Sequence, residues 1–352
     1  MIKALKGKRR QAPLYKYLKQ ETIVSNIYNP AAFQGLGKTK DYFEGWYFKM
    51  VDKNENKAFA VIPGISLSKD VSKSHAFVMV FDARNHKMTY FKYSVNDYWA
   101  DAKKFEVKIG KNFFSTTRLQ LDMDDGVNKV TAEMKMKNII PWPVSTFSPG
   151  VMGWYRFIPF MECYHANISF DHALDGYIEM NNDKTDLTDG KGYIEKDWGT
   201  SMPQAWIWMQ TNHFDEPETS LFGSIAKVPW LGSYFTGYIF GFLYQGKLHK
   251  FTTYNGSRVV RLAVIDDHIE ILAENRESYL EIKADRAEGV ELPAPKMGEM
   301  VSRVNESLAS RIDVKFYIKK LKGKELVFSG IGRNAGLEFV GDLGVLLNGL
   351  KK

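Results

Sequence analysis

The chain has 352 residues, of which 44% are hydrophobic, 25% are charged and 14% are aromatic. This composition is typical of an ordinary globular protein, and the length exceeds one domain, so we expect two. The most apolar stretch, Tyr234–Tyr244, has eleven residues and is too short to span a bilayer. The high aromatic content favours large β-sheets or a roomy apolar cavity.

The positive charge of the chain is concentrated at its beginning. Residues 1–20 hold seven Lys or Arg and no acid, which equals the net charge of +7 of the whole chain. We expect a basic arm that contacts an anionic membrane surface; the alternative is a solvated terminus. No second cluster of that density and no zinc-finger spacing follows, so nucleic-acid binding is not expected.

Cysteine usage and the N-terminal pattern bear on the compartment. Cys163 is the single cysteine, so an internal disulfide and a thiolate metal cluster are excluded. The basic start is not followed by an apolar segment, which argues against a secretory signal. We therefore expect a cytoplasmic protein that can lie peripherally at the inner membrane face.

Strand patterns dominate the first half of the chain. A short helix is predicted at Pro13–Gln20, and an Asp-Gly turn predicts a hairpin from Leu119–Asp122 to Lys129–Met136. Four earlier segments are rich in aromatic and β-branched residues and are separated by turn formers, which predicts strands. These segments are Gly45–Val51, Ala58–Ile62, Ala76–Phe81 and Met88–Val95.

The middle of the chain, residues 139–161, has a different character. It contains four prolines among aromatic residues such as Trp142, Trp154 and Tyr155, and proline blocks central strands. We interpret it as a long loop between two β-rich halves that lines or covers a cavity. The alternative is a hydrophobic connector packed on one half.

Short strands also fill the second half, at intervals of roughly 8–12 residues, as in a sandwich or barrel. A helix is predicted at Gly298–Ser310, where Met300, Val304 and Leu308 recur at every fourth position. The predicted strands are Ala205–Thr211, Leu221–Ala226, Tyr238–Tyr244, Lys247–Tyr254, Val259–Ile265, Ile269–Ala273, Tyr279–Ala284, Arg311–Lys319 and Glu325–Ile331. The predicted fold class is mainly antiparallel β, with few short helices.

Common cofactor and nucleophile motifs are missing. Gly37-Lys38-Thr39 resembles the end of a phosphate-binding loop, but Ala32 stands where that loop needs glycine. There is no G-x-S-x-G, H-E-x-x-H or G-x-G-x-x-G pattern. His165 and His172 are seven residues apart and would face opposite sides of a strand. We therefore expect neither a metal nor a nucleotide cofactor.

Three stretches combine acids or histidine with aromatic residues: Asp41–Lys49, Phe160–His165 and Tyr193–Phe214. In a strand Glu195 and Asp197 share one face, opposite Trp198. A carboxyl held against indole rings in an apolar setting has a raised pKa and can stay a proton donor. The alternative is a turn with its acids in solvent and its tryptophans in the core.

The same stretches resemble the tocopherol cyclase family, in its bacterial branch. The matching segments are Tyr42–Lys49 (YFEGWYFK), Gly153–Tyr155, Pro159–His165, Gly190–Gly199 (GKGYIEKDWG) and Pro203–Phe214, with weaker matches at Glu306–Leu308 and Ala335–Glu338. The resemblance runs from about residue 38 to residue 345 and implies two lipocalin-like β-barrel domains, an architecture similar to that of carotenoid hydratases. The implied division is an arm at 1–37, a first domain at 38–195 and a second domain at 196–352.

The resemblance also implies an activity without metal or redox cofactor. In plant and cyanobacterial members a prenyl double bond is protonated and a quinol hydroxyl attacks the resulting carbocation. Here Asp197 is the expected proton donor, with Glu195 or Glu44 supporting or replacing it. Aromatic and imidazole groups would hold a prenylated or terpenoid lipid: Trp46, Tyr47, Tyr164, His165, Trp198, Trp206 and Trp208. The alternative function is a non-catalytic, lipocalin-like carrier or sensor of a hydrophobic ligand.

Overall fold

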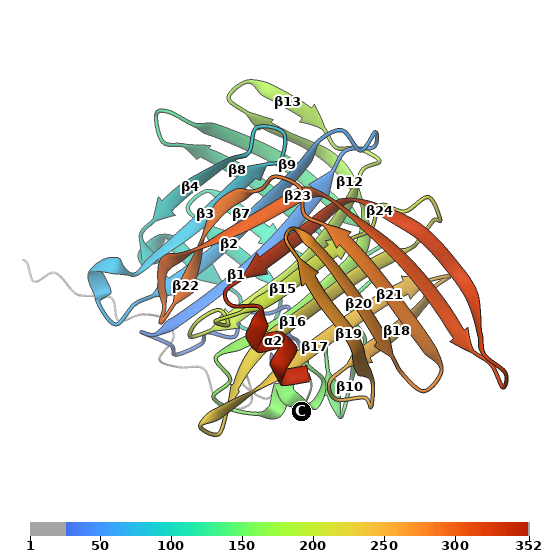
Figure 1. Cartoon of the computed structure of the whole chain (residues 1–352). Coiled ribbons are helices and arrows are strands. Elements are labelled where there is room, and N and C mark those ends of the chain that lie inside the picture. Colours follow the sequence, from blue (N-terminus) through green and yellow to red (C-terminus); the bar gives the residue numbers. More distant parts are fainter. Residues whose placement is uncertain (1–25, 351–352) are drawn as a thin grey trace, which may run out of the picture.

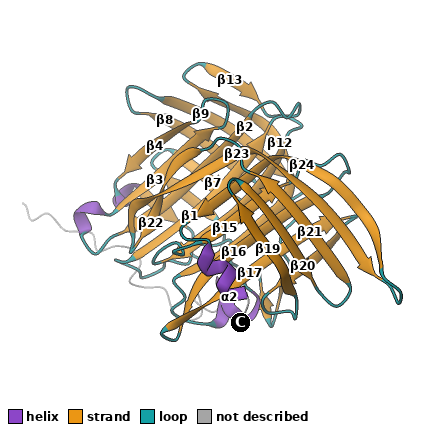
Figure 2. Cartoon of the chain, in the orientation of Figure 1, coloured by secondary structure: helices purple, strands orange, loops and turns teal. Residues whose placement is uncertain are grey.

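The computed structural model of the chain describes residues 26–350. The helix predicted at Pro13–Gln20 and the basic arm of residues 1–20 lie outside the described residues. Within them, no helix is both long and apolar enough to cross a membrane. The predicted mainly antiparallel β fold is confirmed (Figure 2).

The first half of the chain forms one large sheet (Figure 1). Its strand order is β4-β3-β2-β1-β14-β12-β9-β8-β7-β6-β5, with β13 paired to β12, and the predicted Asp-Gly hairpin is β8–β9. The strands are β1 (Tyr42–Val51), β2 (Ala58–Leu67), β3 (His75–Asp82), β4 (Lys87–Tyr93), β5 (Tyr98–Ala100), β6 (Glu106–Ile109), β7 (Asn112–Ser115), β8 (Arg118–Asp124), β9 (Lys129–Lys137), β12 (Cys163–Met180), β13 (Asp183–Asp186) and β14 (Lys191–Gly199).

The second half forms another sheet, in the order β18-β17-β16-β15-β24-β23-β21-β20-β19, with β22 paired to β23. The strands are β15 (Trp206–Thr211), β16 (Ser220–Trp230), β17 (Ser233–Tyr244), β18 (Lys247–Thr252), β19 (Arg258–Ile265), β20 (His268–Glu274), β21 (Ser278–Asp285), β22 (Val290–Lys296), β23 (Glu299–Lys319) and β24 (Lys324–Val340). Helix α2 (Gly344–Leu350) packs against β16 and β17, and β23 reaches over to contact β2 (Figure 1).

Smaller elements connect these strands. They are the two-residue strands β10 (Val144–Ser145) and β11 (Ser148–Pro149), and the 3-10 helices at Val71–Lys73, Val95–Asp97 and Gly153–Phe157. In chain order, β14 is the last strand of the first sheet and β15 is the first strand of the second. The two domains were expected to meet between residues 195 and 196, and β14 continues across this position.

Burial patterns show where the two sheets meet. Strand β9 alternates between buried and exposed residues, as expected when one face covers a core and the other faces water. Strands β1 and β3 are buried on both faces. One face of β1, with Trp46, Phe48 and Met50, packs in the first core, whereas the face with Tyr47 and Val51 packs in a separate cluster with residues of the second sheet such as Trp208.

The helix predicted at Gly298–Ser310 is wrong, because this segment begins the long strand β23. Met300, Val304 and Leu308 are four residues apart, and that spacing fits one face of a strand as well as one face of a helix. In β23 the same face also presents Glu306, which is 1% exposed.

The proline-rich segment, residues 139–161, joins β9 to β12 and therefore lies within the first half, not between the halves as predicted. It nevertheless reaches the second sheet. The Tyr254 hydroxyl donates to the Val151 carbonyl at 2.7 Å, and Tyr155 stacks on Phe235 with ring centroids 5.6 Å apart. The segment thus packs across one end of the interface between the sheets.

Candidate active site

A cavity of about 230 Å³ lies between the two sheets. Both sheets and the segment of residues 139–161 contribute to its wall, as the prediction for that segment required. Most of the wall is apolar, with Phe43, Ile62, Phe77, Met79, Met152, Tyr155, Met161, Ala226, Val228, Phe235, Leu292 and Val304. Such a wall suits an apolar ligand.

Four carboxyl groups and one imidazole interrupt this apolar wall. His165, Glu195 and Asp197 come from β12 and β14 of the first sheet, whereas Glu306 and Glu338 come from β23 and β24 of the second. A ligand in the cavity therefore meets titratable groups from both sheets.

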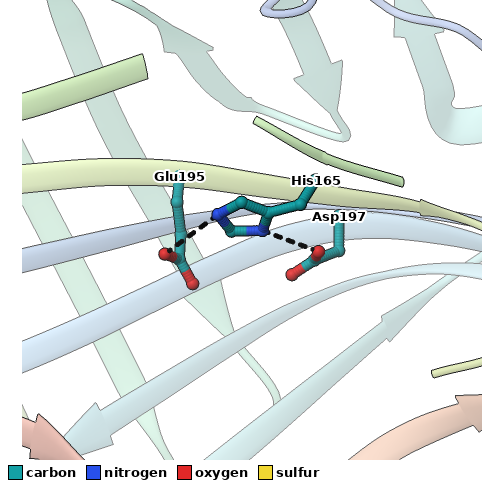
Figure 3. Close-up of side chains that lie close together, drawn as sticks. All are labelled: His165, Glu195 and Asp197. Carbon is teal, nitrogen blue, oxygen red and sulfur yellow. Dashed lines mark hydrogen bonds and ion pairs between the residues drawn. The ribbon is translucent and has the colours of Figure 1, made fainter. Parts of the chain in front are cut away.

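His165 lies between the two carboxyls of β14 (Figure 3). Its Nδ1 is 2.9 Å from Oδ1 of Asp197, a hydrogen-bonding distance, and its Nε2 is 3.7 Å from Oε2 of Glu195. The imidazole also stacks on Phe222 of the second sheet, with ring centroids 5.1 Å apart and planes 5° apart. We call these three residues, His165, Glu195 and Asp197, the histidine cluster.

Strand register explains the histidine cluster. His165 and Asp197 are direct partners in the antiparallel pair of β12 and β14, and Glu195 is two residues before Asp197 on the same face. The prediction that Glu195 and Asp197 share a face opposite Trp198 is confirmed, because Trp198 packs in the core of the first sheet. Burial lowers the pKa of His165, but the charges of Asp197 and Glu195 outweigh it and raise the pKa above its ordinary value.

Glu195 is buried and is held by donors from both sheets. Its Oε2 accepts hydrogen bonds from the Tyr193 hydroxyl at 2.5 Å and from Nε1 of Trp208 at 3.0 Å. Burial raises the pKa of Glu195 to about 7, although His165 opposes the shift. Glu195 can therefore change its protonation state near neutral pH.

Glu306 and Glu338 face each other as partners on β23 and β24. The Tyr47 hydroxyl donates to Oε1 of Glu306, and Nε1 of Trp206 donates to Oε2 of Glu338 at 2.6 Å. Burial raises the pKa of Glu306 to about 8, and burial together with the charge of Glu306 raises the pKa of Glu338 well above its ordinary value. We call these two residues the carboxyl pair.

Lys49 is two residues after Tyr47 in β1, so both side chains lie on the same face of the strand. Its Nζ donates to Oε1 of Gln210 at 2.9 Å and to the carbonyl of Asn334. Burial lowers the pKa of Lys49 to about 7, against the charges of Glu306 and Glu195. The interface between the sheets thus holds a buried amine that is close to losing its proton at neutral pH.

The histidine cluster also has the composition of a metal site. One ligand atom from each of its residues lies within 4.8 Å of the others. His165 and Asp197 already use one of those atoms each in their mutual hydrogen bond, and Glu195 accepts from Tyr193 and Trp208. These contacts are those of an acid–base centre, and the expectation that no metal is needed stays a prediction.

Six residues predicted for the site from the sequence line the cavity: Tyr47, His165, Glu195, Asp197, Trp206 and Trp208. Four others do not reach it. Trp46 stacks on Phe105 inside the first sheet, and Tyr164 stacks on Trp198 there. Their rings belong to the core of the first sheet, because they lie on the faces of β1, β12 and β14 that point away from the second sheet.

Glu44, the remaining predicted acid, also lies away from the cavity. Its Oε1 is 2.6 Å from Nζ of Lys196, and both side chains are completely buried. Its two oxygens accept from the backbone nitrogen of Gln34 at 3.0 Å, and the Tyr42 hydroxyl donates to it as well. Glu44 therefore ties the segment before β1 to the first core, which is a structural role.

The carboxyl pair was missed as a site from the sequence. Glu306 fell in the predicted helix, where no strand face could be assigned to it, and Glu338 stood in a weakly matching segment near the C-terminus. The alternation of Val304, Glu306 and Leu308 was the available signal, because a single acid on an otherwise buried face is unusual.

Known proteins resemble this chain in sequence and in fold. A profile of the tocopherol cyclase-like family matches residues 115–341, nearly two thirds of the chain. A probable chloroplastic tocopherol cyclase of Oryza sativa subsp. japonica is 23% identical over 74% of the chain, and the match spans only 66% of that protein. A chloroplastic tocopherol cyclase of Zea mays is 21% identical over 97% of the chain and 82% of its own length.

Among solved structures, the crystal structure of CghA with Sch210972 has a TM-score of 0.53 at 9% identity, over 86% of this chain and 89% of that one. At this identity the likeness concerns the fold alone. The family match spans GKGYIEKDWG and confirms the resemblance to this family, and the chain belongs to the tocopherol cyclase-like family.

Proposed function

We propose that the protein is an enzyme that cyclises, or hydrates, a prenylated quinol or other terpenoid lipid by acid catalysis without a cofactor. The observation that carries the proposal is the meeting of an apolar cavity with buried, proton-holding carboxyls and a histidine at its wall. The family and its relatives named as tocopherol cyclases support the reaction class.

The chemistry demands such a wall. Protonation of an alkene creates a carbocation, which water would intercept in a polar site, whereas an apolar wall limits the approach of bulk water. The faces of Trp206 and Trp208, which line the cavity, can each stabilise a cation by about 0.5–2 kcal/mol. A nearby hydroxyl of the ligand, or one water molecule, then attacks the cation and loses its proton.

The histidine cluster is the proposed centre for proton transfer on the first sheet. From the sequence, Asp197 was the expected proton donor, with Glu195 or Glu44 supporting or replacing it. Because Nδ1 of His165 lies 2.9 Å from Oδ1 of Asp197, we assign proton transfer on this sheet to the cluster as a unit. Glu44 is left out of this role because it is paired with Lys196 inside the first core.

Turnover of a prenylated quinol tests the proposal. Wild-type protein should convert the quinol into an isomer of unchanged mass, or into a product heavier by one water, as followed by chromatography and mass spectrometry. Asp197→Asn and Glu195→Gln should each fold, and at least one should lose about 10²–10⁴ in rate. Asp175→Asn is the matched control, because Asp175 is a surface residue of β12 whose carboxylate pairs with Lys137. Full activity in both cluster variants would reject the assignment.

The apolar cavity also favours a second candidate, a carrier or sensor of a hydrophobic ligand, which needs no acid. Extraction of the purified protein with organic solvent, followed by mass spectrometry, would identify a lipid that it carries. Bound lipid together with no conversion of the quinol would favour the carrier over the enzyme. In either case we propose a cytoplasmic protein that collects its ligand at a membrane surface through residues 1–20.

A further inference from the structure

The carboxyl pair, Glu306 and Glu338, faces the same cavity as the histidine cluster but belongs to the other sheet. The two residues are direct partners on β23 and β24, so their carboxyl groups start from neighbouring positions on adjacent strands. Two carboxyls so placed disfavour double ionisation, which favours one proton held by the pair.

The surroundings of the pair also favour a bound proton. Within residues 26–350, neither carboxyl forms an ion pair with a Lys, Arg or His side chain. Lys49 acts on Glu306 through its charge but bonds to Gln210 and Asn334 instead. Two adjacent carboxylates without a counter-ion would repel each other in an apolar wall, so the pair keeps at least one proton at neutral pH.

Two donors fix the pair toward the cavity. The Tyr47 hydroxyl and Nε1 of Trp206 each occupy one carboxyl oxygen, and both donors line the cavity themselves. Deprotonation during a reaction would leave a carboxylate that already has hydrogen-bond donors in place, which stabilises the charge as it forms.

We propose that Glu306 and Glu338 together are the proton donor of the site, and that the histidine cluster on the opposite sheet takes the proton back. This proposal rests on the proposed function. The O–H bond of the pair breaks, and the alkene π electrons form a C–H bond with its proton, which leaves a carbocation. The hydroxyl oxygen of the ligand forms the C–O bond, and its proton passes to the histidine cluster. After the product leaves, the histidine cluster releases its proton to water and the pair takes up a proton from water, which restores both groups.

Placing donor and acceptor on different sheets separates the two proton transfers. A trapped cation lies between a wall that has just become anionic and a wall that is ready to accept a proton. The ligand therefore needs to turn little between the steps, which favours ring closure over loss of a proton elsewhere.

Deuterium labelling separates the two roles. In D₂O, reversible protonation of the alkene puts deuterium into recovered prenylated quinol even when ring closure fails. Glu306→Gln and Glu338→Gln should each reduce both this exchange and product formation by about 10²–10⁴-fold. Asp197→Asn should reduce product formation but retain the exchange. Glu291→Gln is the control, because Glu291 is exposed on the neighbouring strand β22.

Infrared spectroscopy gives a readout that does not depend on turnover. Wild-type protein at neutral pH should show the carbonyl band of protonated carboxylic acids, shifted in D₂O. The double Gln variant of the pair should lose part of the intensity of this band but not all of it, because Glu195 can also hold a proton near neutral pH. Wild-type exchange and turnover in both single variants, or an unchanged band in the double variant, would overturn the donor role. A third outcome is that the wild type neither exchanges deuterium nor converts the quinol, while the carbonyl band weakens in the double variant as expected. This outcome would reject both the proposed function and the donor role, and would leave only the conclusion that the pair holds a proton.

Discussion

The buried ion pair of Glu44 and Lys196 allows a quantitative test of how the first core is held together. Both side chains are inaccessible to solvent, and their charged atoms are 2.6 Å apart. Lys196 also donates to the carbonyls of Pro30 and Ala32, at 3.0 and 2.5 Å, and lies over the rings of Trp46 and Trp198. The perturbation is Glu44→Gln, Lys196→Met and the double variant.

The expected magnitudes follow from this geometry. At 2.6 Å and an effective dielectric constant of about 20, the attraction is on the order of 6 kcal/mol, which the cost of desolvating both charges partly offsets. Each single variant leaves one buried charge unpaired and should lower the free energy of unfolding by about 3–5 kcal/mol. The double variant removes both charges, so its loss should be smaller than the sum of the single losses by about 3 kcal/mol.

Urea unfolding followed by tryptophan fluorescence measures these differences, since Trp46 and Trp198 flank the ammonium. Lys53→Met, which breaks the exposed ion pair with Asp189, is the control and should change the unfolding free energy by less than about 1 kcal/mol. Additive losses in the double variant, within about 0.5 kcal/mol, would refute the coupling and with it the structural role of Glu44.

Three further results are expected. The pKa of Glu306 rises from 4.5 to about 8 on folding, so the unfolded chain loses this proton at lower pH than the folded chain. The free energy of unfolding should therefore fall as pH rises between those values, by on the order of 5 kcal/mol. Urea titrations of the wild type and of Glu306→Gln measure this difference. Trp208→Phe removes a hydrogen bond that lowers the pKa of Glu195, so that pKa should rise above about 7 in a carboxyl NMR titration; an unchanged value would contradict the contact. Full-length protein should pellet with anionic liposomes and be released by high salt, whereas protein lacking residues 1–20 should stay in the supernatant.

The sequence was sufficient to predict the β fold and half of the site. Aromatic and β-branched runs marked most strands, and strand alternation alone put Glu195 and Asp197 on one face. The same rule could have excluded Glu44, since Glu44 and Tyr47 are three residues apart in β1 and must face opposite sides. Only one of the two could reach a cavity between the sheets.

Other features could not be predicted from one sequence. The contact of His165 with Asp197 joins residues 32 positions apart, and it depends on the register of β12 against β14, which has irregularities nearby. The carboxyl pair depends on the register of β23 against β24, which also shifts within the same ladder. A strand face can be read from alternation, but the partner of each residue is set by the whole sheet.

The contrast between Glu44 and the carboxyl pair supports a site between the two sheets. Inside the first sheet, Glu44 is paired with Lys196 and surrounded by a packed aromatic core, so there is no space for a ligand beside it. Between the sheets, Glu306 and Glu338 face a cavity and have hydrogen-bond donors but no ion-pair partner among the described residues. Lipocalin-like barrels bind ligands in their interiors, yet both interiors here hold hydrophobic cores. Strands β1 and β3 are buried on both faces because the two sheets share an interface, and the cavity with the proposed acids lies at that interface.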